Sequence, residues 1–301
     1  MQLGLGTAQF GSAYGITNSN GQISADDALH ILQTAENSGV HVLDTAAAYG
    51  DAEEALGRAL WRGHAFRVIT KTLPIGSPSL TRDEVSRTGD AFKRSLDRLR
   101  LDRVAGLLLH HGDEILRPGG GLLADMLLGL KDAGLVERIG ISCYTPEELR
   151  AASRILPPDL VQVPVNILDR RFLSDGILGE LKREGTEIHA RSAFLQGLLL
   201  TPGHALPASF EHHRSAFSKI DAYATSHDLT RLELALGFLA SLPEIDVALV
   251  GVTCVPELEE IVAAWRAMLD ITLDFEDLGY DDESLLLPSR WRKAVSQEAG
   301  K

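Results

Sequence analysis

The sequence predicts an α/β protein folded as a single (β/α)₈ barrel over residues 1–301. Short apolar runs alternate eight times with amphipathic stretches, and the chain is long enough for one barrel of about 250 residues. Runs such as AGLLLH and DVALVGV are almost continuous in apolar residues, which is typical of parallel strands buried on both faces. The runs end near Gly6, Asp44, Lys71, His110, Ser142, Pro164, Ser192 and Gly251.

The stretches between these runs carry the signals of helix ends. Ser24 and Asp27 resemble a capping box with Asp in place of Glu, and Gly39 follows as a stop. Thr145 and Pro146 place a cap and a first-turn proline before two acidic residues. These helices separate the apolar runs, as strand–helix units require.

An open doubly wound sheet is the alternative fold. Its usual glycine fingerprint is incomplete here, because Gly4 and Gly6 are followed by Thr-Ala-Gln without the third glycine. The barrel is therefore the better prediction. Met1 lies directly before the first strand, so we expect no β-hairpin plug at the bottom of the barrel. We expect core side chains to close that end instead.

Composition narrows the class of protein. The net charge of −13 argues against nucleic acid and against anionic membranes as partners. Two distant cysteines provide neither a disulfide framework nor a metal-binding spacing, which favours a reducing, cytoplasmic location. No basic leader precedes an apolar segment, and no apolar run reaches the roughly 18 residues of a membrane span. The oligomeric state is not readable.

Chemistry-bearing residues collect at three successive strand ends. Asp44, Lys71 and His110 end the second, third and fourth apolar runs, and Tyr49 follows in the second loop. Taken singly, each of the four would be interpreted as an ordinary residue in a turn, at the rim or in the packing. The carboxyl ends of barrel strands converge on one face, so the four together predict a catalytic site there.

The same segments carry a family resemblance. In order along the chain, LGLGTAQFG, LDTAAAYGDAEEALGRAL, VITKT, LLLHH, RIGIS and VQVPVN resemble the aldo-keto reductase superfamily. The D-T-x-x-x-Y-G-x-x-E element from Asp44 to Glu53 is the most specific of them. The resemblance implies a (β/α)₈ barrel that binds NADP(H) or NAD(H) without a Rossmann domain. It also implies a catalytic tetrad of Asp44, Tyr49, Lys71 and His110.

Physical chemistry fits these implied roles. Reduction of a carbonyl leaves negative charge on oxygen, which needs a proton donor beside it. The pKa of tyrosine, about 10, is high for this task, and a nearby ammonium from Lys71 would lower it. Asp44 would hold Lys71 protonated, and His110 would orient the carbonyl. The hydride comes from the cofactor, so no metal is needed. A Schiff-base role for Lys71, as in an aldolase, needs a neutral amine, which Asp44 opposes.

The resemblance also implies a set of cofactor contacts. Ser142 and Gln162 would hold the nicotinamide carboxamide, and RSAFLQGLL would cover the pyrophosphate through Ser192, Phe194 and Gln196. VGVTCVPELEEI, from Gly251 onward, would bind adenosine, with helix N–H groups offered to phosphate. Many relatives carry Asn at the position of Cys143, which we interpret as a small buried side chain.

Two differences from the pattern of the aldo-keto reductase superfamily concern the choice of cofactor. Residues 251–261 contain no Lys or Arg but include Glu257 and Glu260, which disfavour a 2′-phosphate. This weakens the family's default of NADPH and leaves NADH open. Arg191 stands where many relatives stack a tyrosine on the nicotinamide ring. Arginine can stack, but its charge opposes the cationic oxidised ring, so we expect it to favour reduction over oxidation.

Candidate substrate contacts are Phe10, Tyr14, His111 and Arg171. Regular strand alternation would turn His111 away from His110, which favours a structural or rim position. The resemblance implies a small carbonyl compound as the substrate, with sugars and small aldehydes as candidates. The sequence thus predicts NAD(P)H-dependent reduction of an aldehyde or ketone. Alternatives are a sugar or alcohol dehydrogenase that uses NAD⁺ at the same site, and a nucleotide-binding redox sensor without turnover.

Overall fold

Eight parallel strands form a closed barrel in the order β1 to β8 in the computed structural model. The structure describes residues 1–291 of the chain, so residues 292–301 of the predicted domain lie outside it. The closed barrel confirms the predicted fold, and each strand ends within one residue of its predicted end. The strands are β1 (Gln2–Gly6), β2 (Val42–Asp44), β3 (Arg67–Lys71), β4 (Val104–Leu109), β5 (Val136–Ser142), β6 (Leu160–Pro164), β7 (Glu187–Arg191) and β8 (Val247–Gly251).

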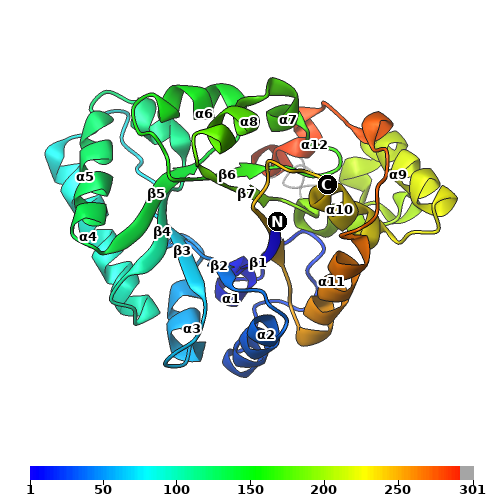
Figure 1. Cartoon of the computed structure of the whole chain (residues 1–301), viewed down its shortest axis with the longest axis horizontal. Coiled ribbons are helices and arrows are strands. Elements are labelled where there is room, and N and C mark those ends of the chain that lie inside the picture. Colours follow the sequence, from blue (N-terminus) through cyan, green and yellow to red (C-terminus); the bar gives the residue numbers. More distant parts are fainter. Residues whose placement is uncertain (292–301) are drawn as a thin grey trace, which may run out of the picture.

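Helices surround the ring of strands, as Figure 1 shows. Ser24 and Thr145 accept hydrogen bonds from the backbone N–H three residues on, which confirms both predicted caps. The main helices are α2 (Ala25–Asn37), α3 (Ala52–Ala59), α4 (Arg82–Leu99), α5 (Gly121–Asp132), α6 (Pro146–Ser153), α8 (Ile177–Arg183), α9 (Arg214–Ser226), α10 (Arg231–Ala240) and α11 (Val255–Met268). Shorter helices are α1 (Ala8–Gly11), α7 (Arg171–Asp175) and α12 (Glu283–Leu286), with 3₁₀ turns at Gly112–Leu116, Leu195–Leu200, Gly203–Ala205, Ala208–His213 and Glu276–Leu278.

The strand register brings the carboxyl ends together at one rim. Gly6 pairs with Asp44, and Ser142 pairs with Gln162. Pro164 pairs with Arg191 in the same way. Residues far apart in the sequence therefore become neighbours at this rim.

Apolar side chains fill the middle of the barrel. A Cβ atom on Gly106 would lie 2.8 Å from Ile69 and 3.1 Å from Leu160, which come from β3 and β6. A Cβ atom on Gly4 would lie 2.7 Å from Val247. Glycine is required at both positions because large aliphatic side chains occupy the space beside them.

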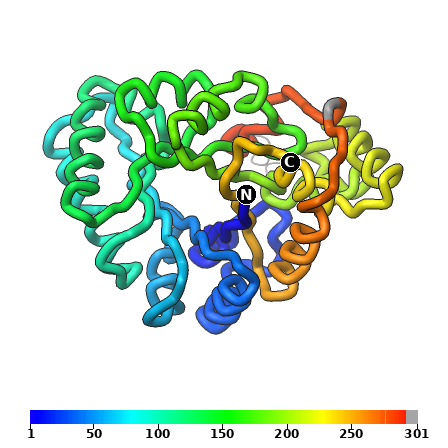
Figure 2. Tube along the Cα trace, in the orientation of Figure 1, coloured from blue at the N-terminus to red at the C-terminus, as the bar shows by residue number. Residues whose placement is uncertain are grey.

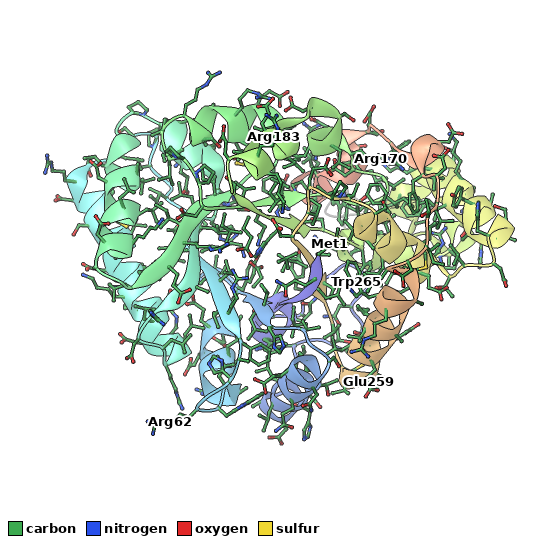
Figure 3. All side chains as sticks on the ribbon, in the orientation of Figure 1. Met1, Arg62, Arg170, Arg183, Glu259 and Trp265 are labelled. Atoms are coloured by element: carbon green, nitrogen blue, oxygen red, sulfur yellow. The ribbon has the colours of Figure 1, made fainter. Side chains whose placement is uncertain are left out.

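The floor of the barrel is charged, contrary to our expectation that core side chains close it. β1 begins at Gln2, so the described residues hold no hairpin before it, as predicted. Arg67 of β3 and Arg138 of β5 both form ion pairs with Glu187 of β7. Met1, near the centre of the view in Figure 3, lines the cavity of about 510 Å³ at this end. Ion pairs between strands from different sides take the place of a plug.

The C-terminal segment packs against the loop after β6. Arg170 donates to the carbonyl of Phe275, and the N–H of Tyr280 donates to Leu168 at 3.0 Å. In Figures 2 and 3 this segment runs beside the loop that carries Arg170. Within residues 1–291, no helix is long and apolar enough to cross a membrane.

Buried His189 makes stability depend on pH. Its Nε2 lies 2.9 Å from Glu187, and burial lowers its pKa from 6.5 to about 4. The unfolded chain therefore takes up this proton at a higher pH than the folded chain. The free energy of unfolding should fall by up to about 1.4 kcal/mol per pH unit between pH 6.5 and 4.

Urea denaturation of His189→Gln across this pH range tests the effect, and the variant should show a shallower decline. His30→Gln, at an exposed position on α2, is the control and should keep the parent slope. Equal slopes for His189→Gln and the parent would contradict the prediction.

Candidate active site

A cavity of about 1100 Å³ opens at the carboxyl ends of the strands. The loops after the strands form its walls, which explains how residues from the whole chain meet there. It is lined by all four predicted tetrad residues (Asp44, Tyr49, Lys71, His110), by every predicted cofactor contact (Ser142, Gln162, Arg191, Ser192, Phe194, Gln196, Gly251, Glu257, Glu260), and by two predicted substrate contacts (Tyr14, His111).

The ammonium of Lys71 is enclosed and fully hydrogen-bonded. Its Nζ donates to Asp44 Oδ1 at 2.7 Å, to Asp44 Oδ2 at 2.8 Å and to the carbonyl of Thr45 at 2.9 Å. Three acceptors match the three N–H bonds of the charged form, whereas a neutral amine has two. Burial lowers the pKa of Lys71, and the carboxylate acts to raise it. This geometry supports a charged lysine and opposes Schiff-base chemistry.

Tyr49 lies in the cavity wall beside Lys71 and His110. Its ring meets the imidazole of His110 edge-on at 5.7 Å, and Lys71 Nζ lies 5.0 Å from the ring centroid. Burial raises the pKa of Tyr49 and Asp44 adds to this, while the Arg191 guanidinium acts in the opposite direction. The expected lowering of this pKa by Lys71 stays a prediction.

His110 is held neutral. Burial lowers its pKa to about 3, and the charge of Lys71 adds to this effect. A neutral imidazole still has one N–H to donate to a carbonyl oxygen. His111 stacks on His110 at 4.9 Å and also lines the cavity, contrary to the expected opposite orientation. β4 ends at Leu109, so strand alternation does not extend to these residues.

Gln162 and Ser142 offer a place for a carboxamide. The side-chain amide of Gln162 donates to Asp44 Oδ1 at 2.6 Å, which turns its Oε1 away from the carboxylate. That Oε1 is buried and has no partner among the described residues. An amide N–H₂ from a nicotinamide would satisfy it. These residues therefore fit the cofactor that the resemblance implies.

The loop after β7 is strained and is held by the first loop. Ser192, Leu195 and Gln196 have φ of 62°, 46° and 55°, which is uncommon for residues other than glycine. Thr17 donates to the carbonyl of Gln196 at 3.1 Å. Both residues line the cavity, so the first loop and this segment form adjoining parts of its wall.

Glu257 and Glu260 lie in the first turns of α11 and differ in what surrounds them. Glu257 accepts from the N–H of Thr253 at 2.6 Å and from its hydroxyl at 2.9 Å, so it is tied to the loop that precedes α11. No side chain caps the first turn of α11 within the described residues, and the offer of its N–H groups to phosphate stays a prediction. Glu260 is exposed and lines the cavity.

Two predicted substrate contacts lie elsewhere. Phe10 is completely buried in the main apolar core. Arg171 does not line the cavity, because it pairs with Asp169 at 2.7 Å at the start of α7. Cys143 is buried, as we expected.

Tyr144 is a wall residue that sequence reasoning missed. The Arg191 guanidinium lies 4.1 Å from the centroid of its ring. The position of Tyr144, two residues beyond the end of β5, is the signal that would have indicated it.

Family comparison agrees with this arrangement. A sequence model described as the aldo/keto reductase family matches residues 2–275. The chain belongs to this family. Aldo/keto reductases are NAD(P)H-dependent oxidoreductases that act on small carbonyl compounds, so the chain is an oxidoreductase of this family.

Two known proteins and one solved structure resemble this chain at low sequence identity. L-galactose dehydrogenase of Arabidopsis thaliana is 27% identical, with 98% of this chain and 94% of that protein covered. 6-dehydroglucose reductase of Novosphingobium aromaticivorans is 26% identical, with coverages of 77% and 78%. The solved structure of aldo-keto reductase AKR11C1 from Bacillus halodurans (holo form) superposes with a TM-score of 0.69 at 21% identity, covering 92% and 89%. That likeness concerns the fold.

Asp44→Ala should destabilise this aldo/keto reductase strongly. Removing the carboxylate leaves the enclosed ammonium of Lys71 unpaired, which typically costs about 3–5 kcal/mol. The double variant Asp44→Ala/Lys71→Met should recover part of that loss, since no buried charge remains. Equilibrium denaturation of the two single variants and the double variant measures the coupling.

Glu54→Ala is the matched control, because Glu54 pairs with Arg58 on the surface of α3 at 46% and 59% side-chain exposure. Its loss should be about 0.5 kcal/mol or less. Equal losses at Asp44 and Glu54 would contradict the structural role of the buried pair.

Proposed function

We propose that this aldo/keto reductase reduces an aldehyde or ketone, with Tyr49 as the general acid. A reduced nicotinamide held by Ser142 and Gln162 would supply the hydride for the carbonyl carbon, and Tyr49 gives its hydroxyl proton to the carbonyl oxygen. The phenolate that remains recovers a proton from water. His110, neutral and at the same wall, donates a hydrogen bond that orients the carbonyl oxygen.

The observation that carries this proposal is the meeting of Tyr49, His110 and the Lys71–Asp44 pair in one cavity wall. A fully used ammonium is a poor nucleophile, which leaves acid–base chemistry as the role of this cluster. Lys71 and Asp44 hold the wall beneath Tyr49, and their charges set its electrostatic surroundings.

NADH is the cofactor that we propose, with NADPH as the family default. Support comes from Glu260, which faces the cavity without a cation nearby in residues 251–261. A carboxylate accepts hydrogen bonds from ribose hydroxyls and repels a 2′-phosphate. Gln162 and Ser142 would hold the carboxamide, and the loop of Ser192, Phe194 and Gln196 would cover the pyrophosphate.

A sugar or small aldehyde is the proposed substrate. Tyr14 and His111 line the same cavity as His110 and offer aromatic faces and hydrogen-bonding groups. Two relatives are named for sugar chemistry, one as a dehydrogenase and one as a reductase. Oxidation of a sugar with NAD⁺ at this site is therefore the second candidate.

Both cysteines are free, which supports a cytoplasmic location.

Tyr49→Phe should reduce kcat by about 10²–10⁴ with at least one carbonyl substrate, because it removes the proton donor. A panel of aldehydes, ketones and aldoses, with NADH and NADPH for reduction and NAD⁺ for oxidation, provides the measurement. Tyr223→Phe, outside the cavity, is the control and should keep parent activity. Equal activity of Tyr49→Phe and the parent, or a parent that turns over nothing, would refute the proposal. The latter result would favour a nucleotide-binding redox sensor.

Glu260→Lys should shift cofactor preference toward NADPH. Replacing a negative charge by a positive one beside the 2′-position should raise the NADPH-to-NADH ratio of kcat/KM by about tenfold or more, equivalent to about 1.4 kcal/mol. Glu259→Lys changes the net charge equally at an exposed residue outside the cavity lining, at the periphery of Figure 3. The same ratio in both variants would show that Glu260 does not select the cofactor.

A further inference from the structure

The cavity of about 510 Å³ at the amino ends of the strands, which we call the floor cavity, is separate from the active-site cavity. None of the described residues that line the floor cavity also lines the active-site cavity. Met1 marks the floor cavity near the centre of Figure 3. Its charged lining residues come from β3, β5, β7, α8 and the turn before β8, and they are Arg67, Arg138, Glu187, Lys182 and Asp246.

Positive charge predominates in the floor cavity. Arg67, Arg138 and Lys182 supply three positive charges to its wall. Glu187 and Asp246 supply two negative charges. The whole chain carries a net charge of −13, so the excess in this cavity is opposite in sign to that of the protein. A small anion that enters the floor cavity therefore meets a wall that attracts it.

Glu187 is shared by two guanidinium groups. Nη2 of Arg67 donates to the two carboxylate oxygens at 3.1 and 2.8 Å, and Nη1 of Arg138 donates to Oε2. Nε2 of buried His189 lies 2.9 Å from Oε1. One carboxylate thus faces two arginines, and neither arginine forms an ion pair with another carboxylate within residues 1–291.

Both arginines keep unused hydrogen-bond donors. A guanidinium has five N–H bonds in a planar fork. Within residues 1–291, Arg67 donates only through Nη2 and Arg138 only through Nη1, which leaves Nε and the other Nη of each without an acceptor. The two side chains line the floor cavity and are 36% and 44% exposed, so a ligand there can reach them. Lys182, whose partner is Asp246, lines the same cavity.

We propose that the floor cavity binds a small oxyanion with two or more negative charges, such as a phosphate or a polycarboxylate. The unused N–H groups of Arg67 and Arg138 hold its oxygens, because a guanidinium fork matches the geometry of carboxylate and phosphate. Lys182 adds a point charge. The bound anion balances the excess positive charge and links β3, β5 and α8 across the floor. This inference does not depend on the proposed function.

Isothermal titration calorimetry of the full chain with inorganic phosphate and with citrate, at neutral pH and constant ionic strength, tests the inference. Arg138→Gln should weaken binding about tenfold or more, because it removes a charge-assisted hydrogen bond. Lys182→Gln leaves the two arginines and Glu187 intact and should weaken binding about threefold or more through the loss of its charge. In thermal denaturation, each anion that binds should raise the Tm of the parent more than that of either variant.

Arg103→Gln is the matched control for the loss of one positive charge. Arg103 pairs with Glu137 at 3.6 Å outside the floor cavity, with side chains 67% and 51% exposed. Because exposed charges at a distance are screened by salt, this variant should bind both anions within about twofold of the parent. Binding of only one of the two anions, lost in both floor-cavity variants, would support the inference and identify the oxyanion.

Three results would overturn the inference. The first is a parent that binds neither phosphate nor citrate in excess of chloride. The second is equal weakening in Arg103→Gln and Arg138→Gln, which would assign binding to general attraction by surface charge. The third is full affinity in Arg138→Gln and Lys182→Gln with loss of binding in Arg191→Gln, because Arg191 lines the active-site cavity and the anion would then bind there.

Discussion

The buried ion pair between Lys71 and Asp44 is the interaction on which the rest of the cavity depends. An ammonium enclosed to this degree must be paired, because an isolated buried charge is very unfavourable. Its three hydrogen bonds join the end of β3 to the end of β2 and to the residue that follows. Gln162 of β6 binds the same carboxylate from the other side. Because Tyr49 follows Asp44 by five residues, the pair also limits where its ring can lie.

Polar residues lie at both ends of the barrel, and mostly apolar side chains lie between them. On β7, Glu187, His189 and Arg191 alternate with buried apolar residues, as a strand with one face inward requires. Glu187 meets two arginines at the floor, and Arg191 reaches the cavity at the opposite end. The same strand therefore supplies a carboxylate to the floor and a guanidinium to the wall of the active-site cavity. Ion pairs can replace a plug here because each carboxylate oxygen finds donors.

The four tetrad candidates could be predicted from the sequence because each ends a strand or follows one. Parallel strands in a barrel direct their carboxyl ends to one rim, so this order along the chain becomes proximity in space. The orientation of side chains in loops does not follow from such periodicity. Phe10 turned into the core, Arg171 paired with its neighbour Asp169, and His111 turned to the cavity because β4 had already ended.

By itself, the sequence determined the barrel, the strand ends and the identity of the residues at its rim, because periodicity, caps and buried charges are local properties. Only the tertiary structure decided how the charges are shared. It assigned all three hydrogen bonds of Lys71 to Asp44 and Thr45, stacked Arg191 on Tyr144, and closed the floor with ion pairs. Electrostatic effects depend on distances and burial between residues from different strands, and those are set by packing rather than by sequence order.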